Sequence, residues 1–146
     1  MSPARRSSCR ILCITSGASY RLLQEFLTLG RAAELEHQAS DVDALQTLRG
    51  LPATQLPNLV IISSRLPALS GVEFIRMMKE DRKLRHIPIV VEDSEVPSGG
   101  VDDLYSAGAT CVLRTAQGLD EFSSKIEGFR QFWLEWVLLP GQRLED

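Results

Sequence analysis

The chain has little of what a secreted, membrane-bound or nucleic-acid-binding protein needs. Its first apolar run, from Ile11 to Ile14, is too short for a signal peptide or a membrane span. Its three cysteines are an odd number and do not make a disulfide framework, which favours a reducing, cytoplasmic compartment. A net charge of −3 and a pI near 5.4 supply no field for nucleic acid or for an anionic membrane. We therefore expect neither of them as a partner.

The sequence also lacks the spacings that hold a metal ion or a nucleotide. Cys9 and Cys13 would lie about 13 Å apart in an extended strand, too far for both thiolates to bind one zinc ion. Ser16-Gly17 alone is too little for a glycine-rich phosphate-binding loop. We expect no metal and no cofactor, and we interpret Cys13 and Cys111 as small buried hydrophobic residues.

The most informative stretch is residues 58 to 71, which contain an apolar run from Leu59 to Ile62. This run has no period-two alternation, as in a strand that helices cover on both faces. Arg65-Leu-Pro67 ends the strand, and Ser70 with Glu73 three residues later predicts the start of a helix. The loop between them lies where open α/β sheets place their sites, beyond the carboxyl ends of the strands.

The rest of the chain repeats this alternation. Further strands are predicted at 10–15, 33–38, 87–91 and 111–113, with 33–38 as a more exposed edge strand. Helical spacings fill the segments between them, and a long helix follows from about Leu119 to Leu138. Five strands alternating with five helices predict one α/β domain, residues 9–139, with a parallel sheet and right-handed crossovers. Residues 1–8 and 140–146 are expected to be a flexible N-terminus and a flexible tail.

Several short motifs stand in the order and spacing of one known family. They are Pro57-Asn-Leu-Val-Ile-Ile62, Leu66-Pro67 with Ser70-Gly71, Arg85-His-Ile-Pro-Ile-Val90, Ala107-Gly-Ala109 and Asp120-Glu-Phe122. With these motifs, residues 9 to 139 resemble a response-regulator receiver domain of two-component systems. The resemblance implies the flavodoxin-like (βα)5 fold with strand order 2-1-3-4-5. The tail from Phe132 to Pro140 further resembles the single-domain regulators associated with bacterial phytochromes.

The positions at which that family carries its chemistry are all substituted. The phosphoaccepting aspartate that ends the third strand is Ser63, and the acidic pair after the first strand is Thr15 and Ser16. The switch residue at the end of the fourth strand falls on Asp93, and the lysine after the fifth strand falls on Thr115. Magnesium needs hard, preferably anionic oxygen ligands, and a neutral serine hydroxyl is a poor nucleophile. We interpret the chain as a degenerate pseudo-receiver, a phosphorylation-independent signalling protein that is not an enzyme.

Two alternatives to this interpretation stay open. The neutral pocket at the carboxyl ends of the strands, around Ser63, can hold a small ligand, unless its hydroxyls bond to loop backbone. A Ser63-based hydrolase is the second alternative, with His37 or His86 as base and Asp93 as orienter. No Gly-x-Ser-x-Gly elbow is present in the sequence to support it.

The last predicted helix carries an apolar stripe along its length. About 20 residues at 1.5 Å each give roughly 30 Å, longer than the edge of a small sheet needs, so its second half projects as an extended C-terminal helix. The residues expected to form an interface there are Phe129, Phe132, Trp133, Trp136 and Val137. A symmetric homodimer is the simplest result, and regulators linked to phytochromes commonly dimerise through this end. A histidine kinase or another response regulator is the other expected partner.

Overall fold

The structure is a computed structural model that describes residues 5–6, 9–27, 33–64, 66–93, 98–114, 128, 140 and 144–145. Its centre is a five-stranded parallel sheet in the spatial order β3-β2-β4-β5-β6. The strands are β2 (Cys9–Ile14), β3 (Ala33–His37), β4 (Leu59–Ser63), β5 (Ile89–Asp93) and β6 (Cys111–Arg114). Numbered along the chain within this sheet, the order is 2-1-3-4-5, so the predicted flavodoxin-like topology is confirmed.

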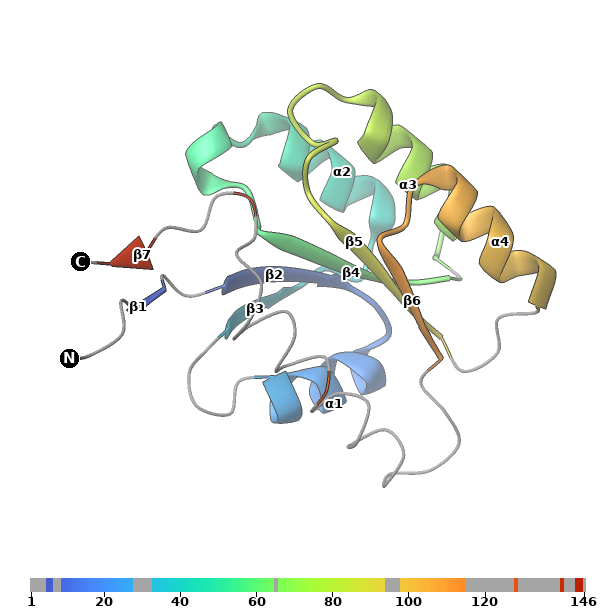
Figure 1. The fold of residues 1–146 in the computed structure, drawn as a ribbon, viewed down its shortest axis with the longest axis horizontal. Helices are drawn as coiled ribbons and strands as arrows, with labels where there is room; N and C mark the ends of the chain where they lie inside the picture. The colour runs from blue at the N-terminus through green and yellow to red at the C-terminus, as the bar shows by residue number, and fades with distance from the viewer. Residues whose placement is uncertain are drawn as a thin grey trace.

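Helices cover both faces of the sheet, which explains why the central strand is continuously apolar. Helices α2 (Asp41–Gly50), α3 (Gly71–Glu80) and α4 (Ser98–Ala107) lie on one face and α1 (Gly17–Leu27) on the other (Figure 1). Within β4, Val60 and Ile62 join the core beneath α2, α3 and α4, whereas Leu59 and Ile61 join the core beneath α1. All four of these side chains are at most 1% exposed.

Helices α2 and α3 begin directly after serines that cap them, whereas α4 begins at Ser98, within a segment (97–100) that the sequence predicted as loop. The hydroxyl of Ser70 accepts a hydrogen bond from Glu73 N at 3.1 Å, and the hydroxyl of Ser40 accepts one from Asp43 N at 3.2 Å. Each bond satisfies one of the amide groups that a helix start leaves without an intrahelical acceptor. Between α2 and β4 lies a short 3₁₀ helix, η2 (Ala53–Gln55), within a segment that was predicted only as a connection.

The fourth strand of the sheet differs from its prediction by two residues at each end. It runs from Ile89 to Asp93, whereas the apolar run predicted 87–91. Pro88 precedes the strand because it has no N–H to donate, and its carbonyl accepts a hydrogen bond from Val60 N at 3.0 Å. The strand therefore extends as far as the two acidic residues Glu92 and Asp93.

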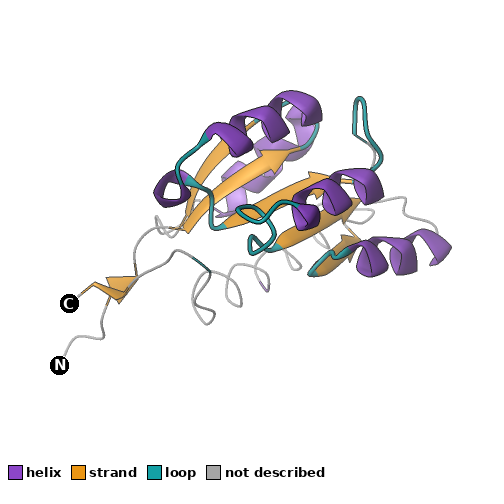
Figure 2. Cartoon of the chain, turned by 90° about the horizontal axis from the view of Figure 1, so that it is seen from above, coloured by secondary structure: helices purple, strands orange, loops and turns teal. Residues whose placement is uncertain are grey.

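The two ends of the described chain meet outside the central sheet. Strands β1 (Arg5–Arg6) and β7 (Leu144–Glu145) pair antiparallel, apart from the sheet (Figures 1 and 2). The flexibility expected for residues 1–8 and 140–146 stays a prediction. The long helix predicted from Leu119 to Leu138 lies outside the described residues. In the described part of the chain, no helix has the length and apolarity of a membrane span.

Candidate functional site

The site begins with a hydrogen bond at the carboxyl ends of two neighbouring strands. Ser63 is the last residue of β4, and its partner in register on β5 is Glu92. The Ser63 hydroxyl donates to Glu92 Oε1 at 3.0 Å, and Glu92 is only 5% exposed. Burial of a carboxylate is costly unless hydrogen bonds compensate for the lost water, so this contact ties the Ser63 side chain to the sheet.

Glu92 is a residue of the site that the sequence did not indicate. The strand was expected to end at Val91, which left Glu92 in a loop. Its only signal in the sequence was an acidic residue that directly continues an apolar run. The parallel register, rather than any motif, brings it beside Ser63.

Thr15 and Ser16 lie together at the end of the adjacent strand. They follow β2, whose Ile14 pairs in register with Ile62 of β4. Both line a hollow of about 350 Å³, together with Ile14, Gly17, Ala39, Leu66 and Pro67. The Thr15 hydroxyl donates to the Ser16 carbonyl at 3.2 Å, and the Ser16 hydroxyl accepts from Ser19 N at 3.2 Å. Both hydroxyls are thus engaged with local backbone.

The loop over this hollow is held by a buried carboxylate from the next helix. Asp41 is 0% exposed, and one of its oxygens accepts from Leu69 N at 2.6 Å. Both carboxylate oxygens also lie 3.3 Å from Ala68 N. Because hydrogen bonds to a charged acceptor are stronger than neutral ones, Asp41 fixes the loop that carries Leu66 and Pro67. No pattern in the sequence indicated this role of Asp41.

Two predicted pocket residues fall partly or wholly outside the described chain. Asp93 is the last residue of β5 and pairs in register with Arg114, but its side chain is not described. Thr115 lies outside the described residues, and so do the side chains of Phe129, Phe132, Trp133, Trp136 and Val137. Their roles in a pocket or in an interface stay predictions.

Neither histidine has the contact with Ser63 that a Ser63-based hydrolase would require. His37 Nε2 is 2.7 Å from the Thr15 carbonyl, and its ring stacks on Tyr20 with centroids 4.6 Å apart. His86 is exposed in the turn before β5. The hydrogen bond of Ser63 goes to Glu92 instead of to an imidazole.

Burial also sets the pKa values of the cysteine thiols. Cys9 and Cys13 are both 0% exposed, whereas Cys111 is partly buried. Burial raises the pKa of the Cys9 thiol to about 12, and burial together with the negative charge of Glu92 raises the pKa of Cys13 to about 12. Both thiols are therefore protonated at neutral pH, which is the weakly nucleophilic form. Among the residues that the structure describes, no group of three His, Cys, Asp or Glu side chains could hold a metal ion.

The fold and the position of this site resemble those of response-regulator receiver domains. No protein-family model matches the chain. Response regulator Rcp1 from Synechocystis sp. is 28% identical over 138 residues, which cover 90% of this chain and 92% of Rcp1. The polar-differentiation response regulator DivK from Brucella ovis is 26% identical over 97 residues, covering 63% of this chain and 79% of DivK.

Solved structures point to the same class. The crystal structure of Mn²⁺-bound Rcp1 matches with a TM-score of 0.81 and 28% identity over 90% of this chain and 99% of that one. The phosphorylated cyanobacterial phytochrome response regulator RcpA has the same fold, with a TM-score of 0.83 and 24% identity over 92% and 99% of the two chains. The chain therefore has the receiver fold and resembles the phytochrome-associated response regulators.

Proposed function

We propose that the chain is a phosphorylation-independent receiver, which signals by binding other proteins in a reducing, cytoplasmic compartment. The observation that carries this proposal is the hydrogen bond from Ser63 to Glu92. At the position where the family forms an acyl phosphate, this chain has a hydroxyl that donates to a buried carboxylate. A phosphoryl group brought to this place would meet a negative charge beside a weak nucleophile.

The residues present do not fit the magnesium ion that receiver chemistry uses. Magnesium binds through hard oxygen ligands, usually one or two carboxylates, in near-octahedral geometry. Thr15, Ser16 and Ser63 carry no charge, and Thr15 and Ser63 use their hydroxyl protons within the protein. The one carboxylate placed beside Ser63 in the described structure is Glu92, which is buried. Rcp1, whose Mn²⁺-bound form has been solved, is a relative with which the metal binding of this chain can be compared.

The output of such a protein is a binding event, and we propose a homodimer as its simplest form. The support is the aromatic stripe of the last predicted helix, from Phe129 to Val137, and the resemblance to phytochrome-associated regulators. A histidine kinase or another response regulator is the further partner that this class of protein suggests. The test is the solution mass of the intact chain and of a variant in the stripe, which is set out in the Discussion.

A small-ligand sensor is a second candidate function, and one observation favours it. The hollow beside Thr15 and Ser16, about 350 Å³, is at the lower end of the volumes of small-molecule sites, roughly 300–1,000 Å³. We rank this function second because the hydroxyls of both residues already bond to local backbone. Few polar groups are then left to orient a ligand.

A further inference from the structure

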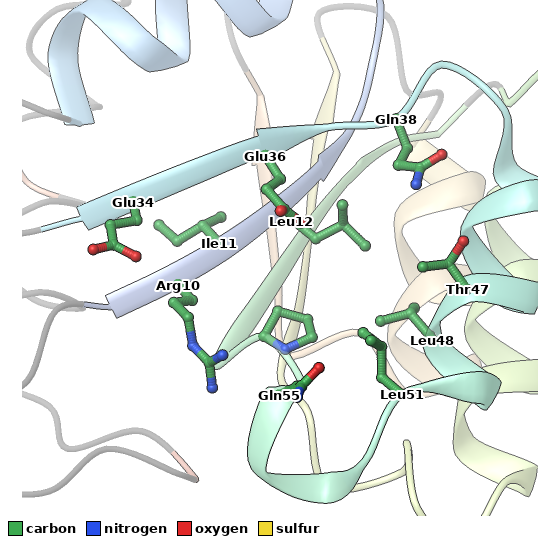
Figure 3. A pocket seen from close by; sticks show the side chains of 11 residues that line it. Arg10, Ile11, Leu12, Glu34, Glu36, Gln38, Thr47, Leu48, Leu51 and Gln55 are labelled. Carbon is green, nitrogen blue, oxygen red and sulfur yellow. The ribbon is translucent and has the colours of Figure 1, made fainter.

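A second cavity lies between β2, β3, the end of α2 and the connection before β4. It has a volume of about 120 Å³ and shares no lining residue with the hollow at Thr15 and Ser16. Figure 3 shows Leu12, Leu48 and Leu51 pointing into it from β2, from α2 and from the residue after α2. Polar side chains from β3 lie around this apolar floor. The cavity is thus amphipathic, with an apolar base and a polar rim.

The charge at the rim comes chiefly from two glutamates on the edge strand. Glu34 and Glu36 are both exposed and both line the cavity (Figure 3). Since they are two residues apart in a strand, their side chains leave the same face roughly 7 Å from each other. In the described part of the chain, neither glutamate forms an ion pair. Both glutamates therefore place a carboxylate at the rim of the cavity.

Arg10 lies close to Glu34 and Glu36 but forms no ion pair with either of them in the described structure. Arg10 pairs in register with Glu34, and Leu12 pairs with Glu36. The guanidinium of Arg10 donates to the Thr54 carbonyl at 3.1 Å, so it is directed to the connection before β4. The net charge of the three side chains is −1, and Glu36 has an apolar residue opposite it in the sheet. A cation from outside would therefore be favoured at the rim.

The size of the cavity decides what kind of cation fits. Its volume of about 120 Å³ is about four times the share of one water molecule in the liquid, roughly 30 Å³. It is well below the roughly 300 Å³ at which small-molecule sites begin. One amphipathic side chain fits such a space, with its methylene stem on the leucines and its charged head at the carboxylates.

We propose that this cavity binds a lysine or arginine side chain from an extended segment of a partner protein that lies along β3. Strand β3 is the edge of the sheet, and an extended segment added to an edge places every second side chain on the same face. Two basic residues in alternate positions would then face Glu34 and Glu36. Exposed charges also protect an edge strand from unwanted pairing, but that role does not require the apolar floor formed by Leu12, Leu48 and Leu51.

The experiment is a titration of the ¹⁵N-labelled full chain with a model peptide, acetyl-Val-Arg-Val-Arg-Val-amide, followed by amide chemical shifts. We expect saturable shifts in β3 and in the end of α2, from Thr47 to Gln55. A peptide with glutamine in place of arginine should bind more weakly. The Glu34→Gln/Glu36→Gln double variant keeps the shape of the cavity and should bind the basic peptide about 2- to 30-fold more weakly, as expected for two exposed ion pairs.

A matched control separates local recognition from general attraction by negative charge. Glu73→Gln/Glu80→Gln removes the same charge from exposed positions on α3 and should change the affinity by less than about twofold. Equal losses in the two double variants would overturn the proposal, and so would shifts confined to another surface. An absence of shifts at millimolar peptide would overturn it as well. The amide spectrum of each free variant shows whether it is folded.

Discussion

At the scale of single residues, the site includes two buried side chains that belong to no short sequence motif. Glu92 and Asp41 are both buried acidic residues, and each bonds to a segment distant in the sequence. Asp41 contacts an amide 28 positions later in the chain, a relation that only the folded topology creates. Thr15, Ser16 and Ser63 could be assigned from sequence because apolar strands directly precede them. Bonding to local backbone was one expectation for these hydroxyls, and Thr15 and Ser16 meet it, whereas the Glu92 partner of Ser63 could not be predicted.

The role of Asp41 predicts a stability loss that depends on its carboxylate. Asp41→Ala removes the acceptor of the Ala68 and Leu69 amides. Because hydrogen bonds to a charged group contribute about 1.5–3 kcal/mol to stability, we expect a loss of that order. Asp41→Asn keeps one acceptor oxygen and should cost less. The free energy of unfolding in urea measures both.

The matched control for this prediction is Asp43→Ala, an exposed position on the same helix turn. It should cost less than about 1 kcal/mol. Hydrogen exchange at the Ala68 and Leu69 amides should speed up in Asp41→Ala alone. If Asp41→Ala and Asp43→Ala are equally stable, Asp41 does not hold this loop.

The buried thiols predict a dependence of stability on alkaline pH. The pKa values of Cys9 and Cys13 rise from an ordinary 9.0 to about 12 in the folded protein. Because the unfolded thiols ionise first, their contribution to stability is complete below about pH 9 and is lost as pH rises toward 12. Between pH 8 and 10 we expect a loss of roughly 1 kcal/mol for each thiol.

The Cys9→Ala/Cys13→Ala double variant isolates this effect from other groups. Burial and the charges of Cys13 and Glu36 raise the pKa of Tyr20, and burial lowers that of Lys79. Both proteins are therefore prepared with Tyr20→Phe, so that the remaining Lys79 titration is common to them. The difference between parent and double variant, measured by urea unfolding at the two pH values, is therefore the thiol contribution. A pH-independent difference would show that the two thiols ionise as readily in the folded protein as in the unfolded one.

At the scale of elements, apolar runs located four strands of the sheet, and a weak alternation at 33–38 located the edge strand β3. Their ends were less certain, because a run such as Ile87 to Val91 does not show where pairing starts. Pro88 delays the start of β5, and register with β4 carries the strand on to Glu92 and Asp93. The local sequence pattern thus shows that a strand is present, whereas its first and last residues depend on the neighbouring strand.

Gly108, the residue after α4, allows a direct test of how that helix ends. Gly108 has a φ of +121°, and a Cβ atom at this position would lie 2.9 Å from Lys79 Cγ. The Lys79 side chain is held by hydrogen bonds to the carbonyls of Arg85 and Ile87, both 3.1 Å. Gly108→Ala should therefore destabilise the protein by roughly 1–3 kcal/mol, measured by urea unfolding.

Gly50→Ala is the matched control for this substitution. A Cβ at Gly50, the last residue of α2, meets no atom within 4 Å. Alanine there should be neutral or should stabilise the protein by up to about 1 kcal/mol. Equal effects of the two substitutions would contradict the strained conformation at Gly108.

At the scale of the whole molecule, the proposed homodimer is tested by light scattering. We expect a dimer for the intact chain and a folded monomer for the Phe132→Ala/Trp133→Ala/Trp136→Ala variant. The reason is that burial of large aromatic side chains usually dominates interface energy. Val42→Ala is the control, since Val42 is 42% exposed on α2 and should leave the dimer intact. A monomeric parent chain would exclude the dimer and direct the search to a heterologous partner.

The central claim, signalling without phosphorylation, is tested most directly with acetyl phosphate. The intact chain and RcpA, whose phosphorylated form has been solved, are incubated side by side with acetyl phosphate and Mg²⁺, and their intact masses are compared. We expect RcpA to gain a phosphoryl group and this chain to gain none, because a Ser63 hydroxyl bonded to Glu92 replaces the acceptor carboxylate. A gain of one phosphoryl group at a defined residue of this chain would contradict the claim.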